Sequence, residues 1–183
     1  MDAEAVGVQE IGRRWFRWSL GGEVNARDPF FQFMAVRVAF NAFYSWAYGP
    51  ARRGLWRDRL RAICSQNGFT RRGGAPGDRE KVQLFSTEEY ARELHLGLLR
   101  TDGDYREAVR YLEDWPPANP ERSRRIGDTG CLEQVLLCVY QVRNNLFPGG
   151  KMPDSSRDGR IVRESFTIVP KILGPCLAQG TWN

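Results

Sequence analysis

Polar residues suited to phosphate gather near one end of an otherwise apolar segment of the sequence. They are Arg143, Asn144, Asn145 and Lys151. Arginine offers a planar fork of donors that matches phosphate oxygens, lysine offers a point charge, and an amide side chain both donates and accepts hydrogen bonds. Together, these residue types could hold a phosphate group.

Arg143 falls on the apolar side of the helix expected over residues 131–147. At steps of three and four, that side consists of Leu132, Val135, Leu136, Val139, Tyr140, Arg143, Leu146 and Phe147. A guanidinium remains charged and is costly to desolvate, so it must be paired, face an interface or line a polar cleft. Two interpretations stay open. Arg143 is either a buried arginine satisfied by a carboxylate or by helix carbonyls, or a functional residue of a cleft.

The segment from Val139 to Lys151, followed by Arg157 and Asp158, resembles the signature segment of the HEPN superfamily. In that signature a helix ends in Arg, a polar residue, a few spacers and then His. Residues 39–46 also resemble the family's early helix. The resemblance implies a helical bundle that commonly dimerises, bringing two Arg/His motifs together. It further implies metal-independent endoribonuclease activity in toxins or antiviral defence.

The resemblance assigns catalytic positions to two residues of this chain. Arg143 would hold the scissile phosphate and stabilise its charge, and Asn144 would orient the reacting groups. Asn145 and Lys151 would add RNA phosphate contacts. The histidine, which would move protons to and from the 2'-hydroxyl or the leaving oxygen, is replaced by Pro148. Proline has neither an ionisable group nor a backbone N–H.

With Pro148 in the histidine position, the chain can resemble the family without having its catalytic activity. Loss of a general acid or base typically slows a reaction by about a hundred- to ten-thousand-fold. Three explanations remain: a natural non-catalytic member that keeps the cleft for binding, a toxin altered by cloning or design, or another group in place of the histidine. The chain's only histidine, His95, lies in an apolar stretch, where we expect a satisfied core or surface residue rather than a base.

Three hypotheses about function follow. The first is an RNA-binding, homodimeric protein of ribonuclease, toxin–antitoxin or antiviral-defence lineage that is catalytically impaired as written. The second is a non-catalytic protein interaction or dimerisation module that binds a partner such as an antitoxin or a larger defence assembly. In the third, Arg143 only supports a dimer core. Whether the chain is an enzyme is left open by the sequence.

Composition indicates one globular domain spanning residues 1–183. Hydrophobic residues make up 42% of the chain and charged residues 27%, which is typical of a folded domain. The net charge is +5 and the basic residues are nearly all arginine, which favours an RNA or DNA partner. A GC-rich genome would produce the same arginine usage, so both explanations remain.

The cysteines argue against a metal or another cofactor. They lie at positions 64, 131, 138 and 176, and none forms a CxxC pair or has a histidine at ligand spacing, so we expect no zinc site. The first twelve residues lack the apolar segment of a signal peptide, and no run reaches membrane-spanning length. We therefore expect a cytoplasmic protein with reduced cysteines and no membrane contact.

Periodicity and capping signals predict an all-α helical bundle. The clearest helix begins at Pro29, with Asp28 as its cap, and ends at Gly49-Pro50. It is apolar around most of its circumference, which indicates a central helix. Its one polar stripe is expected to face solvent and consists of Arg37, Asn41, Tyr44 and Tyr48.

The remaining predicted helices surround this central one. A break is expected near Ser86-Thr87, a kink at Pro170, and an irregular loop from about 115 to 130, where three prolines interrupt the sequence. The predicted helices cover residues 8–20, 55–66, 78–100, 131–147 and 156–177.

Overall fold

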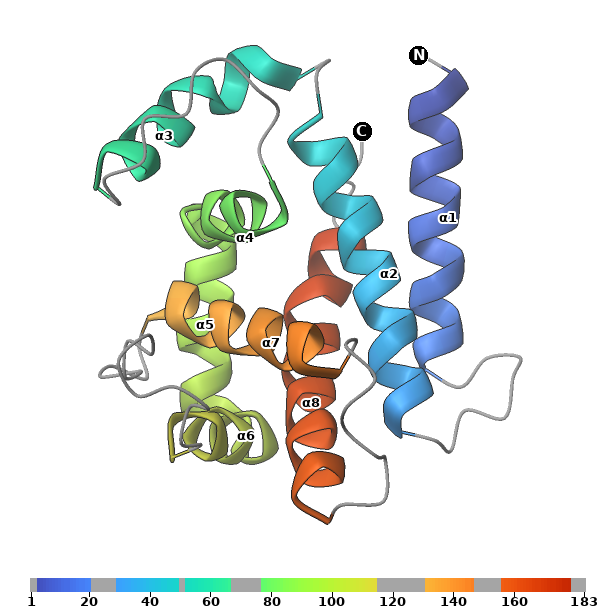
Figure 1. The fold of residues 1–183 in the computed structure, drawn as a ribbon, viewed down its shortest axis with the longest axis vertical. Coiled ribbons are helices and arrows are strands. Elements are labelled where there is room, and N and C mark those ends of the chain that lie inside the picture. Colours follow the sequence, from blue (N-terminus) through green and yellow to red (C-terminus); the bar gives the residue numbers. More distant parts are fainter. Residues whose placement is uncertain are drawn as a thin grey trace.

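The computed structural model describes residues 3–20, 29–49, 52–66, 77–114, 131–146 and 156–178. Every regular element in these ranges is an α-helix, which confirms the all-α prediction (Figure 1). The helices are α1 (Ala3–Ser19), α2 (Pro29–Ala47), α3 (Arg53–Gln66), α4 (Asp78–Ser86), α5 (Glu89–Thr101), α6 (Gly103–Asp114), α7 (Leu132–Leu146) and α8 (Ser156–Ala178).

Helix α2 is central, as its apolar composition predicted. It begins at Pro29, where proline loses no hydrogen bond because the first-turn N–H groups of a helix have no partner within it. It packs against α1, α4 and α8 (Figure 1). Phe33, Phe40 and Phe43 are buried in these contacts, so α2 contributes aromatic side chains to the core on more than one side.

The break predicted near Ser86-Thr87 is present. Helix α4 ends at Ser86, and α5 begins at Glu89. The N–H groups of Thr87 and Glu88 donate to the carbonyls of Leu84 and Phe85 over 3.1 and 3.0 Å, which closes the last turn of α4. The break turns α5 away from α4 while the side chains at the end of α4 stay in the core.

Helix α6 was not predicted. Its N-terminus is capped by Asp102, whose Oδ1 accepts a hydrogen bond from the N–H of Tyr105 over 2.9 Å. Its buried face consists of Tyr105, Ala108, Val109 and Leu112, at the spacing of an amphipathic helix. The signal was therefore present in the sequence, as an aspartate cap followed by apolar residues at steps of three and four.

Helix α7 lies across α8, and its C-terminal end approaches α2 (Figure 1). Helix α8 continues through Pro170 and Pro175; the predicted kink at Pro170 stays a prediction. Of the residues predicted for its apolar face, Phe166 is half-buried and the others are buried: Ile161, Val162, Val169, Ile172 and Leu173.

Two other predictions differ from the structure or lie beyond it. Helix α1 begins at Ala3, five residues before the predicted start at Val8, and the predicted loop at about 115–130 lies outside the described residues. In the described ranges, we find no helix that combines the length and the apolar character needed to cross a membrane.

Candidate functional site

Arg143 and Asn144 lie together near the C-terminal end of α7. The Nη1 atom of Arg143 donates a hydrogen bond to Oδ1 of Asn144 over 3.0 Å, and both side chains are half-buried. Val139 and Val142 occupy the fully buried side of the helix. Arg143 therefore lies at the edge of the buried face and not at its centre. In this edge position its guanidinium is partly desolvated.

A second arginine, Arg37 of α2, lies beneath this edge. Only 3% of Arg37 is exposed. Its Cζ atom is 5.9 Å from the ring centroid of Phe40 and 5.9 Å from that of Tyr140, which belongs to α7. Tyr140 precedes Arg143 by three residues, a rise of about 4.5 Å and slightly less than one helical turn. Arg37 thus lies close to the turn of α7 that carries Arg143.

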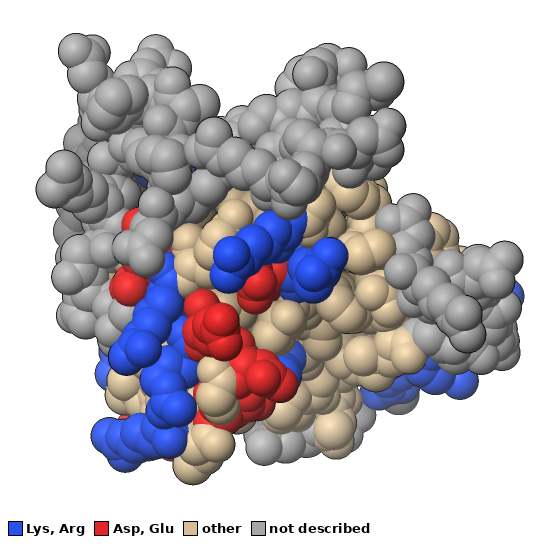
Figure 2. Space-filling model, turned by 90° about the horizontal axis from the view of Figure 1, so that it is seen from below, with Lys and Arg blue, Asp and Glu red and all other residues tan. Residues whose placement is uncertain are grey.

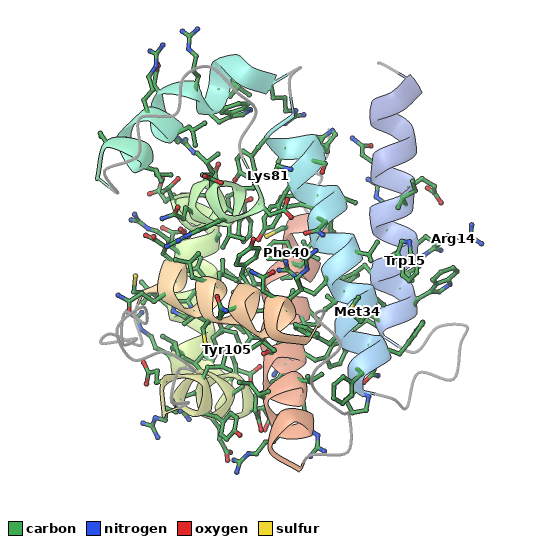
Figure 3. The ribbon with its side chains drawn as sticks, in the orientation of Figure 1. Arg14, Trp15, Met34, Phe40, Lys81 and Tyr105 are labelled. Atoms are coloured by element: carbon green, nitrogen blue, oxygen red, sulfur yellow. The ribbon has the colours of Figure 1, made fainter. Side chains whose placement is uncertain are left out.

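The electrostatics agree with this proximity. Burial lowers the pKa of Arg37, and the nearby charge of Arg143 lowers it further, while Tyr44 and Asp78 act in the opposite direction. Figure 3 labels Met34 and Phe40, one turn before and one turn after Arg37, and shows the C-terminal part of α7 passing beside this part of α2. Like charges near one another in a partly buried place favour the binding of an anion.

The polar stripe of α2 is buried, so its predicted exposure to solvent is wrong. Arg37, Tyr44 and Tyr48 are buried and Asn41 is half-buried. The stripe is covered by residues of other helices: the ring of Tyr44 lies 5.9 Å from that of Phe85 at the end of α4, and Cζ of Arg37 lies 5.9 Å from the ring centroid of Tyr140 on α7. Local periodicity describes the polarity of a face but does not specify what packs against it.

Several polar atoms of this stripe have no hydrogen-bond partner among the described residues. They are Nε and Nη1 of Arg37, Oδ1 of Asn41 and the hydroxyl oxygen of Tyr44. Buried polar groups are nearly always hydrogen-bonded, so each exception calls for an explanation. Of these residues, Arg37 is the one close to Arg143.

The structure describes some of the sequence-predicted site residues and not others. Arg143 and Asn144 are brought into contact, as described above. Asn145 belongs to α7, but its side chain lies outside the described part of the structure, as do Pro148 and Lys151 entirely. Arg37 is the residue that sequence reasoning missed as a site candidate; its signal was a lone arginine on a helix that is apolar around most of its circumference.

His95 is a core residue, as expected. It is 1% exposed, and its Nδ1 atom lies 2.6 Å from the hydroxyl oxygen of Tyr105 on α6. Within the described ranges, no cluster of three or more His, Cys, Asp or Glu side chains is arranged as metal ligands would be.

Surface charge alone does not mark a nucleic-acid surface on the face shown in Figure 2. A band of positive side chains runs down one edge of the described part of this face, and negative side chains lie directly beside it. Several arginines and lysines elsewhere are paired, as in Lys171–Asp102 (2.6 Å) and Arg160–Glu164 (3.5 Å). The net positive charge is therefore less informative than the local pair of arginines at α2 and α7.

A hollow between α3 and α5 is less suited to phosphate. Its lining includes Arg59 and Arg92, but also Glu88, Glu89 and Glu93. Arg59 is already paired with Glu88, with Nη1 and Oε1 2.8 Å apart. Carboxylates at such a surface repel an anion, so the arginines of α2 and α7 remain the stronger candidate.

The sequence matches no known family, no curated protein and no solved structure in the three comparisons made. Function therefore has to be inferred from the residues around Arg143.

Proposed function

We propose that this chain is a HEPN-like, RNA-binding protein of ribonuclease, toxin or antiviral-defence lineage that holds RNA phosphates at the C-terminal end of α7. The observation that carries the proposal is the position of Arg143, which is half-buried, hydrogen-bonded to Asn144 and close to a second arginine. The HEPN resemblance supports the same residues, because Arg143 and Asn144 occupy its arginine and polar positions.

The chemistry of this arrangement suits a phosphodiester. A guanidinium donates two parallel hydrogen bonds to phosphate oxygens, and its bond to Asn144 restricts the directions in which it can point. Partial burial strengthens its attraction for an anion compared with a fully solvated arginine. In this proposal Asn145 and Lys151 contact neighbouring phosphates.

Cleavage is a separate question from binding. Pro148 cannot carry a proton, and His95 is buried in a hydrogen bond to Tyr105. We therefore propose a protein that binds RNA but is catalytically impaired as written. In the proposed homodimer, two copies of the α7 end meet across a two-fold axis, so that both Arg143 side chains face one RNA strand.

Fluorescence anisotropy with a labelled single-stranded RNA of mixed sequence tests the proposal. Arg143→Met should weaken binding at least about tenfold, and the plot of log affinity against log salt should become shallower by about 0.7 for one lost phosphate contact. Arg92→Met is the matched control, because Arg92 is exposed on α5. The Arg92→Met variant should bind the RNA with the same affinity as the unaltered protein.

Two outcomes would contradict the proposal. One is the absence of salt-dependent RNA binding by the unaltered protein; the other is equal binding by Arg143→Met. If RNA does not bind but the chain associates with a protein in a salt-insensitive manner, the interaction-module hypothesis replaces it. If Arg143→Met only lowers stability, Arg143 supports a dimer core.

A further inference from the structure

Arg37 is a buried charge, and two of its three side-chain nitrogen atoms lack a hydrogen-bond partner among the described residues. The residue is 3% exposed, and its Nε and Nη1 atoms have no hydrogen-bond partner among the described residues. A buried guanidinium cannot give up its proton to escape the cost of desolvation. Such a group is normally paired with an acid or with several acceptors, and leaving it unpaired destabilises the folded protein.

The carboxylate of Asp78, which attracts Arg37, does not satisfy these two nitrogen atoms. Asp78, at the start of α4, exerts an attraction on Arg37, but its carboxylate forms an ion pair with Lys81, whose Nζ lies 3.7 Å from Oδ1. The faces of Phe40 and Tyr140, each 5.9 Å away, offer only a weak cation–π attraction. The described protein groups therefore leave the positive charge of Arg37 undercompensated.

The positive charge of Arg143 adds to the uncompensated positive charge around Arg37. It has the same sign as Arg37 and acts on it across the α2–α7 contact. Each arginine makes burial of the other less favourable, and an anion near both would offset their repulsion. Arg143, Asn144 and Tyr140 are half-buried, whereas Arg37 is buried, so an anion bound between the two arginines would have Arg143 on its more exposed side and Arg37 on its deeper side.

We infer that α2 and α7 together form a phosphate-binding site, with the buried guanidinium of Arg37 as its floor and Arg143 as its rim. Guanidinium groups match the geometry of phosphate oxygens, and the unpartnered nitrogen atoms of Arg37, close to a second positive charge, favour an anion with more than one charged oxygen. The inference rests on the proposed function for the source of the phosphate, which would be an RNA strand. A free phosphate or pyrophosphate offers the same chemistry.

Thermal unfolding and calorimetric titration with pyrophosphate test the site, with ionic strength held constant by chloride. The melting temperature of the unaltered protein should rise with pyrophosphate concentration. Arg37→Met should bind pyrophosphate at least about tenfold more weakly, because the floor charge is lost, and should melt at a higher temperature without ligand, because an apolar side chain of similar length replaces an unpaired charge. Arg92→Met should behave like the unaltered protein.

A second variant keeps the test decisive if Arg37→Met does not fold. Arg37→Gln retains a polar side chain but removes the charge, so its pyrophosphate affinity should also fall at least about tenfold. Unchanged affinity in either folded variant, or no response of the unaltered protein to pyrophosphate, would overturn the inference. So would an Arg37→Met protein of lower stability and unchanged affinity, which would make Arg37 a purely structural residue.

The RNA measurement separates this inference from the proposed function. If Arg143→Met weakens RNA binding and Arg37→Met leaves it unchanged, the floor role of Arg37 is wrong while the proposed function stands. If pyrophosphate binding requires both arginines but RNA does not bind, the phosphate site stands and its ligand is a free phosphoanion. Loss of both ligands in both variants supports one shared site.

Discussion

The Nδ1 atom of His95 lies 2.6 Å from the hydroxyl oxygen of Tyr105, and both side chains are buried. This contact joins α5 to α6 in the core. It also gives the only histidine of the chain a structural role in the core. A HEPN ribonuclease needs an imidazole beside its arginine. Because His95 is buried against Tyr105, it does not present an imidazole to solvent.

Replacing Tyr105 and Tyr44 by phenylalanine should change stability in opposite directions. Tyr105→Phe removes the hydroxyl that contacts Nδ1 of His95, and a buried polar atom that loses its hydrogen bond costs about 1–3 kcal/mol, so the free energy of unfolding should fall. Tyr44→Phe removes a buried hydroxyl without a partner among the described residues, so the free energy of unfolding should rise by roughly 1 kcal/mol. Urea denaturation in phosphate-free buffer measures both; a fall in both variants would mean that Tyr44 is satisfied.

Pro148→His should confer RNA cleavage. If the α7 end is a ribonuclease site that lacks only its proton carrier, restoring an imidazole should raise cleavage of mixed cellular RNA by about a hundredfold or more. Pro148→Ala is the control for the loss of proline alone. The double variant Pro148→His with Arg143→Met should return cleavage to background, whereas adding His95→Leu should not, provided that protein folds.

The latent-nuclease interpretation fails if Pro148→His cleaves RNA no faster than Pro148→Ala. RNA binding would then be the remaining part of the proposal, because binding depends on the arginines and not on position 148. Growth of cells expressing each variant gives an independent readout, since a restored ribonuclease toxin should slow growth.

The ion pair between Asp102 and Lys171 should contribute to stability in a pH-dependent manner. The hydrogen bond from Lys171 (2.6 Å) is the main cause that lowers the pKa of Asp102, followed by the bond from the N–H of Tyr105. A lowered carboxyl pKa stabilises the fold above the unfolded value of about 3.9, and this stabilisation is lost as the pH falls through the folded pKa.

Lys171→Met therefore should unfold more readily than the unaltered protein at pH 7, and the two should converge near pH 2. Asp102→Ala should lose more at pH 7, because it also removes the cap of α6. Urea denaturation across this pH range provides the comparison. A difference between Lys171→Met and the unaltered protein that persists unchanged at pH 2 would show that the lost stability is not due to the charge of Asp102.

Cys138 and Cys176 should resist alkylation in the folded protein. Burial raises the pKa of each thiol to about 12. At pH 8.5 an unfolded cysteine is about half ionised, so the folded thiols should react with iodoacetamide roughly a thousandfold more slowly. Mass spectrometry after timed alkylation, with and without denaturant, measures both sites. Equal rates in the two conditions would show that these thiols are not buried in solution.

The sequence by itself determined most of the helical framework. The start of α2 at Pro29, the break after Ser86 and the apolar face of α8 follow from caps, prolines and spacing, which act within a few residues. It also predicted that His95 would be satisfied in an apolar setting. Helix α6 carried the same kind of local signal, in Asp102 and the spacing of Tyr105 and Leu112, although it was not predicted.

The tertiary structure alone decided which polar residues are buried. Arg37, Tyr44 and Tyr48 have the spacing of a solvent-facing stripe, yet all three are buried, with Tyr140 of α7 near Arg37 and Phe85 of α4 near Tyr44. Burial depends on residues far apart in the sequence, whereas periodicity reports only the faces of one helix. For the same reason, the segment around Arg143 was enough to identify Arg143 as a candidate. That Arg37 lies close to it depends on the tertiary contact between α2 and α7, which are far apart in the sequence.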